Sequence, residues 1–356
     1  MATTMKTTWL ESFSSDAAAV EVQERPKPVP GPGELLVRMR LAPVNPSDFN
    51  YIRGTYLAAY ERMLWNYEAP HPVDRPGSEP FPRPPYALGV EGLGTVESAG
   101  PGLLGKGLVG RRVAVVGGPP RGTFSQYACI EARRAFPVPS SLSDEQACSF
   151  FVNPLTSLAL VRSVLGVPRG SWLLQTAAGS ALGQMVRNLA KLDGFELIDV
   201  VRSRAGADRL AQAGAKHVVA LEDQDLLAVV RELTAGQGVP YVLDCVGGPS
   251  ASDALRCLSP GGQMVCFGTL SGEPIPLQPR DLMMPGTRIE GFYLPVWLGQ
   301  QSVFQRLSWL RSAAKLIGRG VLSSPVQEIV PLDDLQKAFA LASAPGRSGK
   351  ILLDLR

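Results

Sequence analysis

The chain has 356 residues, of which 45% are hydrophobic and 19% are charged, and its formal net charge is +3. This length supports two domains with separate cores, and the composition is that of an ordinary globular protein. The small net charge does not favour a nucleic-acid partner. No apolar run reaches the ~18 residues of a membrane span, and no secretion signal opens the chain. We therefore expect a cytoplasmic protein without a membrane partner, with an organelle matrix as the alternative location.

The sequence contains few of the residue patterns that bind metal ions or form nucleophilic triads. The only histidines are His71 and His217, and neither lies in a partner motif. The five cysteines follow no paired spacing and are typical of small buried residues in a reducing compartment: Cys129, Cys148, Cys245, Cys257 and Cys266. The sequence therefore predicts neither a zinc site nor a Ser-His-Asp triad.

The N-terminal part has the character of a β domain. Clusters of proline and glycine, such as Pro26–Gly33, separate short apolar runs. The candidate strands are Thr8–Phe13, Glu34–Leu41, Leu88–Ala99 and Arg111–Val116. Many short strands joined by turns predict a partly closed, barrel-like domain.

A turn and a long loop interrupt these strands. In the segment Asn45–Tyr56, Pro46 and Asp48 predict a turn into a short helix, with Tyr56 just beyond its end. Residues 57–87 are expected to form a loop, which is either a working lid or disordered. Its aromatic residues are Tyr60, Trp65, Tyr67, Phe81 and Tyr86.

After residue 140, helices and strands alternate. Ser143 and Gln146 have capping-box spacing at the start of one helix, and Asn153 leads a second. Later helix candidates are Ala205–Ala213, Leu226–Leu233 and Ala251–Leu258, and strand candidates are His217–Ala220, Tyr241–Val246, Gln263–Gly268 and Arg288–Phe292. This alternation predicts an α/β fold with a doubly wound parallel sheet and helices on both faces.

The stretch Ser171–Arg204 contains a strand, a bend of small residues, a helix and a second strand. In its bend, the usual G-x-G-x-x-G positions are occupied by Ala178, Ser180 and Gly183. Alanine and serine are small enough to admit a pyrophosphate, which would bind the amides at the helix start. The alternative is a helix start without a ligand.

The end of the second strand indicates which dinucleotide would bind. An NAD site usually has an acid there, whereas this chain has Arg202, Ser203 and Arg204. Two cations and a hydroxyl suit a 2′-phosphate and favour NADPH, although the arginines could also belong to a solvated turn. The rival acid, Asp199, lies inside the apolar run.

The C-terminal part contains two candidate helices, 302–318 and Asp334–Ala342, and a closing strand, Lys350–Leu355. We expect this tail to return to the first domain. The predicted domains are therefore 1–140 together with 296–356, which carry the catalytic site, and 141–295, which bind the cofactor.

Six motifs in this order resemble those of the medium-chain dehydrogenase/reductase superfamily, and within it the zinc-free 2-enoyl thioester reductases. They are N-P-S-D followed by G-T-Y in Asn45–Tyr56, V-N-P-L-T from Val152, S-A-L-G-Q from Ser180, V-V-R-S-R from Val200, D-C-V-G-G from Asp244 and G-F-Y-L-P-V-W from Gly291. The resemblance implies a GroES-like catalytic domain and a Rossmann domain. Gly89-Val90-Glu91 stands where zinc-dependent relatives have G-H-E, and Ser203 replaces an acid.

The resemblance also implies a reaction and a set of site residues. Hydride transfer from NADPH to the β-carbon of a 2-enoyl thioester, carried by CoA or acyl carrier protein, would use Tyr56 as proton donor and enolate stabiliser. The implied substrate pocket includes Asn45 and Trp297, and a homodimer is expected. The implied cofactor-binding residues are Asn153, Ala178, Gly179, Ser180, Ala181, Leu182, Gly183, Arg202, Ser203, Arg204, Val246, Phe267, Gly268, Thr269, Phe292, Tyr293, Leu294 and Lys350.

Two other functions are compatible with these residues. A zinc-free quinone or enone oxidoreductase would use the same hydride chemistry without a proton-donating tyrosine. A non-catalytic NADPH-binding scaffold or sensor would bind the nucleotide without oxidising it.

Overall fold

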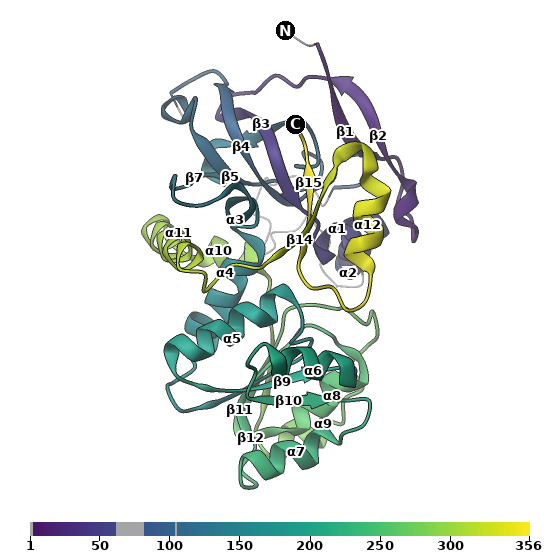
Figure 1. Ribbon diagram of the computed structural model, residues 1–356, viewed down its shortest axis with the longest axis vertical. Helices are drawn as coiled ribbons and strands as arrows, with labels where there is room; N and C mark the ends of the chain where they lie inside the picture. Colours follow the sequence, from purple (N-terminus) through teal and green to yellow (C-terminus); the bar gives the residue numbers. More distant parts are fainter. Residues whose placement is uncertain (1–2, 62–81, 104) are drawn as a thin grey trace. The chain divides into compact units, whose positions relative to one another are not determined.

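The computed structural model describes residues 3–61, 82–103 and 105–356. These residues form two compact units (Figure 1). Unit 1 comprises Met1–Val152, Ala314–Gly318 and Ser323–Arg356, and unit 2 comprises Asn153–Ala313 and Arg319–Leu322. The bounds differ from those of the expected domains, because 141–152 belong to unit 1 while 296–313 and 319–322 belong to unit 2.

Unit 1 is built on a curled sheet of seven strands. The order is β14-β15-β3-β4-β5-β7, and β6 pairs with β3 beside this path. Because β3 pairs with β15, β4 and β6 along its length, the sheet bends into the expected barrel-like form. The strands are β3 (Glu34–Pro43), β4 (Glu91–Ala99), β5 (Arg112–Val116), β6 (Tyr127–Glu131), β7 (Ala135–Pro137), β14 (Val326–Pro331) and β15 (Lys350–Asp354), and a separate hairpin joins β1 (Thr4–Leu10) to β2 (Val20–Pro26).

The C-terminal strand joins an N-terminal strand, β3, in the core of unit 1. Strand β15 runs antiparallel to β3, so the C-terminal tail does return to the N-terminal strands (Figure 1). Leu35, Val37 and Met39 alternate along β3 and pack into one cluster with Ile351 and Leu353. This pairing brings residues near position 350 beside residues near position 45.

The segment expected as a loop contains ordered structure at both ends. Helix α2 (Thr55–Glu61) occupies its start, and Tyr86, 1% exposed, lies in the core near its end. The backbone of Tyr86 forms an isolated antiparallel β-bridge with Leu10, and its hydroxyl donates a hydrogen bond to the Tyr51 carbonyl. The expectation of a loop is therefore wrong at its start, whereas residues 82–85 form no helix or strand, as expected. Trp65, Tyr67 and Phe81, to which the alternatives of a lid or disorder apply, lie outside the described residues.

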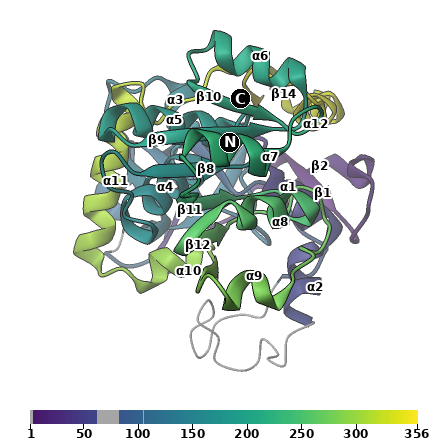
Figure 2. The same ribbon diagram turned by 90° about the horizontal axis from the view of Figure 1, so that it is seen from below.

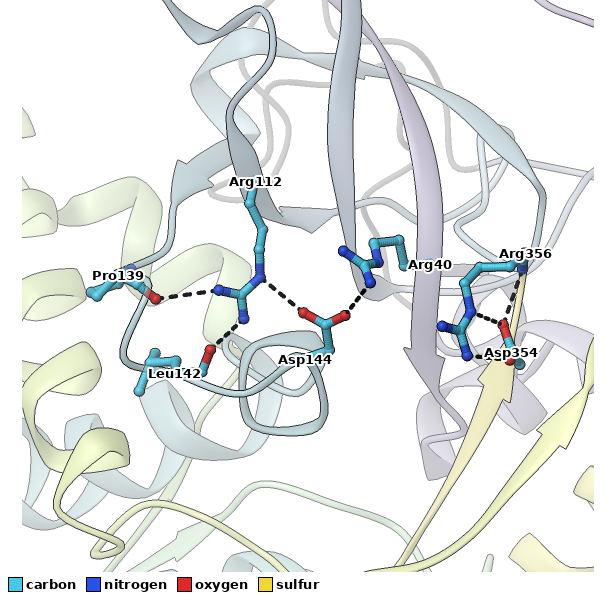
Figure 3. Close-up of polar contacts among 7 residues, drawn as sticks. All are labelled: Arg40, Arg112, Pro139, Leu142, Asp144, Asp354 and Arg356. Atoms are coloured by element: carbon cyan, nitrogen blue, oxygen red, sulfur yellow. Dashed lines mark hydrogen bonds and ion pairs between the residues drawn. The ribbon is translucent and has the colours of Figure 1, made fainter.

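The other helices of unit 1 are α1 (Pro46–Arg53), α3 (Asp144–Cys148), α12 (Leu335–Ser343) and the short turns η1 (Ala17–Ala19), η2 (Lys106–Leu108), η3 (Ala132–Arg134) and η5 (Leu332–Asp334). The predicted capping box at Ser143 and Gln146 is confirmed. The Asp144 carboxylate forms ion pairs with Arg40 on β3 at 2.9 Å and Arg112 on β5 at 3.0 Å (Figure 3). These contacts attach α3 to the sheet, which accounts for its place in unit 1.

Unit 2 contains a parallel sheet of six strands in the order β10-β9-β8-β11-β12-β13. In chain order this is 3-2-1-4-5-6, the arrangement of dinucleotide-binding sheets. The predicted doubly wound sheet is confirmed. The strands are β8 (Trp172–Gln175), β9 (Glu196–Val201), β10 (His217–Ala220), β11 (Val239–Asp244), β12 (Leu258–Cys266) and β13 (Arg288–Gly291).

Helices flank the strands of unit 2 (Figure 2). Adjacent residues of β9 point to opposite faces: Val200 packs in the cluster that includes α7 and α8, and Val201 packs with Leu210 of α6. The helices are α4 (Val152–Ala159), continued by a π turn (Leu160–Val164), α5 (Ala181–Asp193), α6 (Arg204–Gln212), α7 (Leu226–Leu233), α8 (Gly248–Arg256), α9 (Pro279–Met283), α10 (Leu294–Gln300) and α11 (Val303–Gly318), which contributes to both units. Within the described ranges, no helix combines the length and apolar character that crossing a bilayer requires.

Candidate active site

Tyr56 lies just beyond the end of α1, as expected, and in the first turn of the next helix, α2. Helix α1 ends at Gly54, which has the left-handed φ of 68°. A Cβ there would lie 2.9 Å from the Phe13 ring, so glycine lets the chain turn tightly into the next helix. The Tyr56 ring packs edge-on against Tyr51 at 5.1 Å between centroids.

The phenol of Tyr56 is held in its protonated form. Partial burial raises its pKa above the usual value, a hydrogen bond with the Asn50 side chain opposes this rise, and nearby Asp48 adds to it. A phenol with a raised pKa stays neutral throughout the physiological range. It can therefore donate a proton or a hydrogen bond to a developing oxyanion.

Asp48 belongs to a buried charged network inside unit 1. Its Oδ2 accepts a hydrogen bond from the Asn45 backbone amide at 2.8 Å, and the backbone of Val90 also interacts with this carboxyl group. Burial raises the pKa of Asp48 to about 7, and the neighbouring Glu91 contributes to the rise while Lys350 opposes it.

Glu91 and Lys350 form the rest of this network. Glu91 Oε2 accepts hydrogen bonds from the Phe151 and Val152 amides at 2.9 Å each, and Oε1 accepts one from Asn45 Nδ2 at 3.1 Å. Lys350 Nζ donates to Asn45 Oδ1. Burial raises the pKa of Glu91 and lowers that of Lys350, since each charge has lost solvent.

Two residues with expected ligand contacts belong to this network, and their expected roles stay predictions. Asn45, expected in the substrate pocket, is 1% exposed and joins Glu91 to Lys350 in the interior of unit 1. Lys350, expected at the cofactor phosphates, is 5% exposed and directs its amine to Asn45.

Unit 2 has its own candidate site at the carboxyl ends of β8 and β11, the adjacent strands where the strand order reverses. Thr176 follows β8 and donates a hydrogen bond of 2.6 Å to Asp244 at the end of β11. The Asp244 carboxylate also accepts from the Val246 and Gly247 amides at 3.3 and 2.9 Å. This cross-strand contact fixes the start of both following turns.

The bend between β8 and α5 has the geometry of a phosphate turn. Ala177 has the left-handed φ of 47°, and Ala178 is fully buried. Ser180 caps α5, its Oγ accepting a hydrogen bond from the Gly183 amide at 3.0 Å. A Cβ on Gly183 would lie 2.6 Å from the Ala178 oxygen, so only glycine permits this close packing of helix and turn.

The end of β9 presents cations to solvent. Arg202 is exposed and makes no hydrogen bond or ion pair with any described residue, whereas Arg204 lies 3.3 Å from Asp223 and 3.4 Å from Asp208. Ser203 caps α6. The rival acid Asp199 is 1% exposed and points inward.

The remaining predicted cofactor residues lie on or after neighbouring elements. Val246 follows β11; Phe267, Gly268 and Thr269 follow β12; Phe292, Tyr293 and Leu294 follow β13; Asn153 lies on α4; and Ala181 and Leu182 open α5 beside exposed Gly179. Trp297, expected in the acyl pocket, is 8% exposed and packs against Phe292 and Trp309 within unit 2. The roles of these residues stay predictions.

Known proteins resemble both halves of the chain. The alcohol dehydrogenase GroES-like domain family matches residues 31–140, and the zinc-binding dehydrogenase family matches residues 181–312. A mitochondrial enoyl-[acyl-carrier-protein] reductase of Arabidopsis thaliana is 30% identical over 324 residues, which cover 89% of this chain and 78% of the relative. The chain belongs to the medium-chain dehydrogenase/reductase superfamily.

Solved structures agree with this family of oxidoreductases. A quinone oxidoreductase of Pseudomonas syringae has a TM-score of 0.83 at 25% identity, covering 98% of this chain and 99% of that one. A mycobacterial structure in complex with NADPH has a TM-score of 0.81 at 25% identity, covering 98% and 100%. Although one matching family is named for zinc, the described residues contain no group of three or more His, Cys, Asp or Glu side chains that could hold a metal ion.

Several residues of these sites received no individual role from the sequence. Asp48 has capping-box spacing from Asn45, a local signal that could have identified it. Glu91 and Thr176 had no such signal, since their partners lie far away along the chain.

Proposed function

We propose that this member of the superfamily reduces the carbon–carbon double bond of a 2-enoyl thioester with NADPH. The observation that carries the proposal is Tyr56 itself, whose ring packs against Tyr51 in a segment that resembles the family's catalytic tyrosine motif, in a chain 30% identical to an enoyl-[acyl-carrier-protein] reductase. CoA and acyl carrier protein remain the candidate carriers, and a homodimer remains the proposed assembly.

The residues of unit 2 fit NADPH. A Cβ at Gly179 would meet nothing within 4 Å, so the outer side of the turn is open, and the α5 amides that follow it suit a pyrophosphate. Arg202, exposed and without a partner among the described residues, suits a 2′-phosphate together with Ser203. When bound, NADPH supplies the hydride.

The contribution of the chain to the chemistry is a proton and a hydrogen bond. Negative charge develops on the thioester oxygen during conjugate reduction, and a positioned neutral donor stabilises it. Tyr56 is that donor, since its raised pKa keeps the proton on the phenol until the enolate forms. The α-carbon is then protonated, by the phenol or by water.

The test compares turnover of crotonyl-CoA by wild type, Tyr56→Phe and Tyr51→Phe, followed by the loss of NADPH absorbance. Removing the donor should lower kcat by about 10²–10⁴-fold. Tyr51→Phe keeps the ring that packs against Tyr56 and should stay within a few-fold of wild type. Equal activity of Tyr56→Phe and wild type would refute the role of the phenol.

The structural similarity to a quinone oxidoreductase supports a second candidate, the reduction of quinones or enones. That reaction requires no proton from Tyr56. If Tyr56→Phe and wild type reduce a quinone equally and neither reduces crotonyl-CoA, the second candidate is correct. If no enal, enone, quinone or enoyl thioester is reduced, the protein is an NADPH-binding scaffold.

A further inference from the structure

A buried ion pair lies behind the phosphate turn of unit 2. Arg187 on α5 and Asp199 on β9 are 2.7 Å apart between Nε and Oδ2, and their side chains are 8% and 2% exposed. Gln175, the last residue of β8, donates to Asp199 Oδ1 at 2.6 Å. Three polar side chains from three elements thus meet in the interior of unit 2.

Each donor in this cluster also holds a backbone carbonyl beside the turn. Arg187 Nη2 donates to the Ala178 oxygen at 2.9 Å, and Gln175 Nε2 donates to the Gly183 oxygen at 3.0 Å. Long side chains on a helix extend back toward its N-terminus, which explains how Arg187 reaches a residue that precedes α5. The cluster therefore connects the turn to the sheet beneath it.

Stability is a weak reason to bury such a pair. Replacing a buried ion pair by apolar residues of similar volume is often neutral or stabilising, because removing two charges from water costs as much as their attraction returns. A role in positioning the phosphate turn explains the buried pair better. The turn has alanine and serine at two usual glycine positions, and Ala177 has a left-handed φ that alanine adopts at a cost.

We propose that Arg187 is a positioning residue for the pyrophosphate of the dinucleotide. By holding the Ala178 carbonyl on the interior side, it keeps a partial negative charge away from the anion and leaves the amides that follow turned outward. The pair also keeps Asp199 inside, so that its negative charge stays away from Arg202 and the 2′-phosphate of the ribose. This inference rests on the NADPH site of the proposed function.

The decisive variant is the double substitution Arg187→Met with Asp199→Leu, which replaces the pair by apolar residues. NADPH binding is followed by its fluorescence, folding by the urea midpoint, and the adenosine end by 2′-AMP, which lacks the pyrophosphate. We expect a urea midpoint close to wild type, NADPH binding weakened about tenfold or more, and 2′-AMP binding within about twofold of wild type.

Arg187→Lys provides a second variant in case the double variant fails to fold. Lysine keeps the positive charge opposite Asp199 but lacks the planar guanidinium that reaches both the Asp199 carboxylate and the Ala178 carbonyl. NADPH binding should therefore weaken again, while 2′-AMP binding is retained. The inference is wrong if the folded variants bind NADPH like wild type, or if both ligands weaken equally. Because binding is measured without turnover, an inactive wild type that still binds NADPH would contradict only the proposed reaction.

Discussion

Asp48→Asn tests the buried network of unit 1 through the pH-dependence of stability. The substitution keeps an oxygen that can accept the Asn45 amide hydrogen bond, and it removes a carboxyl that titrates in the interior. The folded pKa of Asp48 is about 7 instead of 3.8, because burial penalises the charged form.

The sign of the pH-dependence follows from which state, folded or unfolded, loses the Asp48 proton first. Below pH ~4, the folded and unfolded states both carry the proton, so the protonated carboxyl contributes its full stability. As the pH rises toward 7, the unfolded state loses its proton first, and the folded state becomes less stable relative to it. At roughly 1.4 kcal/mol for each pH unit between the two pKa values, the loss reaches about 4 kcal/mol above pH 7.

The assay is urea unfolding of wild type and Asp48→Asn at pH 5 and pH 8. The variant should gain roughly 3 kcal/mol relative to wild type between these pH values, because asparagine has no proton to lose. Asp253→Asn, which removes a carboxylate from an exposed ion pair, should change the pH-dependence little. Parallel pH profiles for Asp48→Asn and wild type would show that Asp48 is not the group that titrates.

Three further predictions concern the other residues of these sites. Lys350→Met should destabilise the protein by roughly 3–5 kcal/mol in urea unfolding, because it leaves the buried carboxyl groups of Asp48 and Glu91 without the Lys350 cation. If this variant is as stable as wild type, the network does not depend on Lys350. Gly183→Ala should lower the urea midpoint and weaken NADPH binding, since its Cβ would meet a carbonyl at 2.6 Å, whereas Gly179→Ala, whose Cβ would meet no protein atom within 4 Å, should leave the urea midpoint unchanged. Arg202→Ala should raise the Kd of NADPH about tenfold and leave the Kd of NADH nearly unchanged. Arg204→Ala should have the smaller effect on NADPH binding, because the Arg204 guanidinium already pairs with two carboxylates. A larger effect of Arg204→Ala would contradict this assignment.

Local patterns in the sequence were sufficient for several elements of unit 2 and for the start of α3 in unit 1. The strand His217–Ala220 and the helix Leu226–Leu233 have the predicted bounds, and the capping box at Ser143 and Gln146 is present. Such elements depend on the spacing of apolar residues and on capping groups within a few positions, so the sequence contains their signals directly. The parallel sheet followed from their alternation.

The tertiary structure alone decided which polar groups share a desolvated interior. Asn45, Glu91 and Lys350 meet because β15 lies beside β3, and Arg187 and Asp199 meet because α5 packs near β9. The placement of Tyr86 in the core is also a result of long-range packing. Periodicity indicates that a side chain faces inward, but the partner that satisfies a buried charge depends on strand pairing between distant segments. The sequence by itself therefore determined the elements and the family motifs, and the fold determined the electrostatics of both sites.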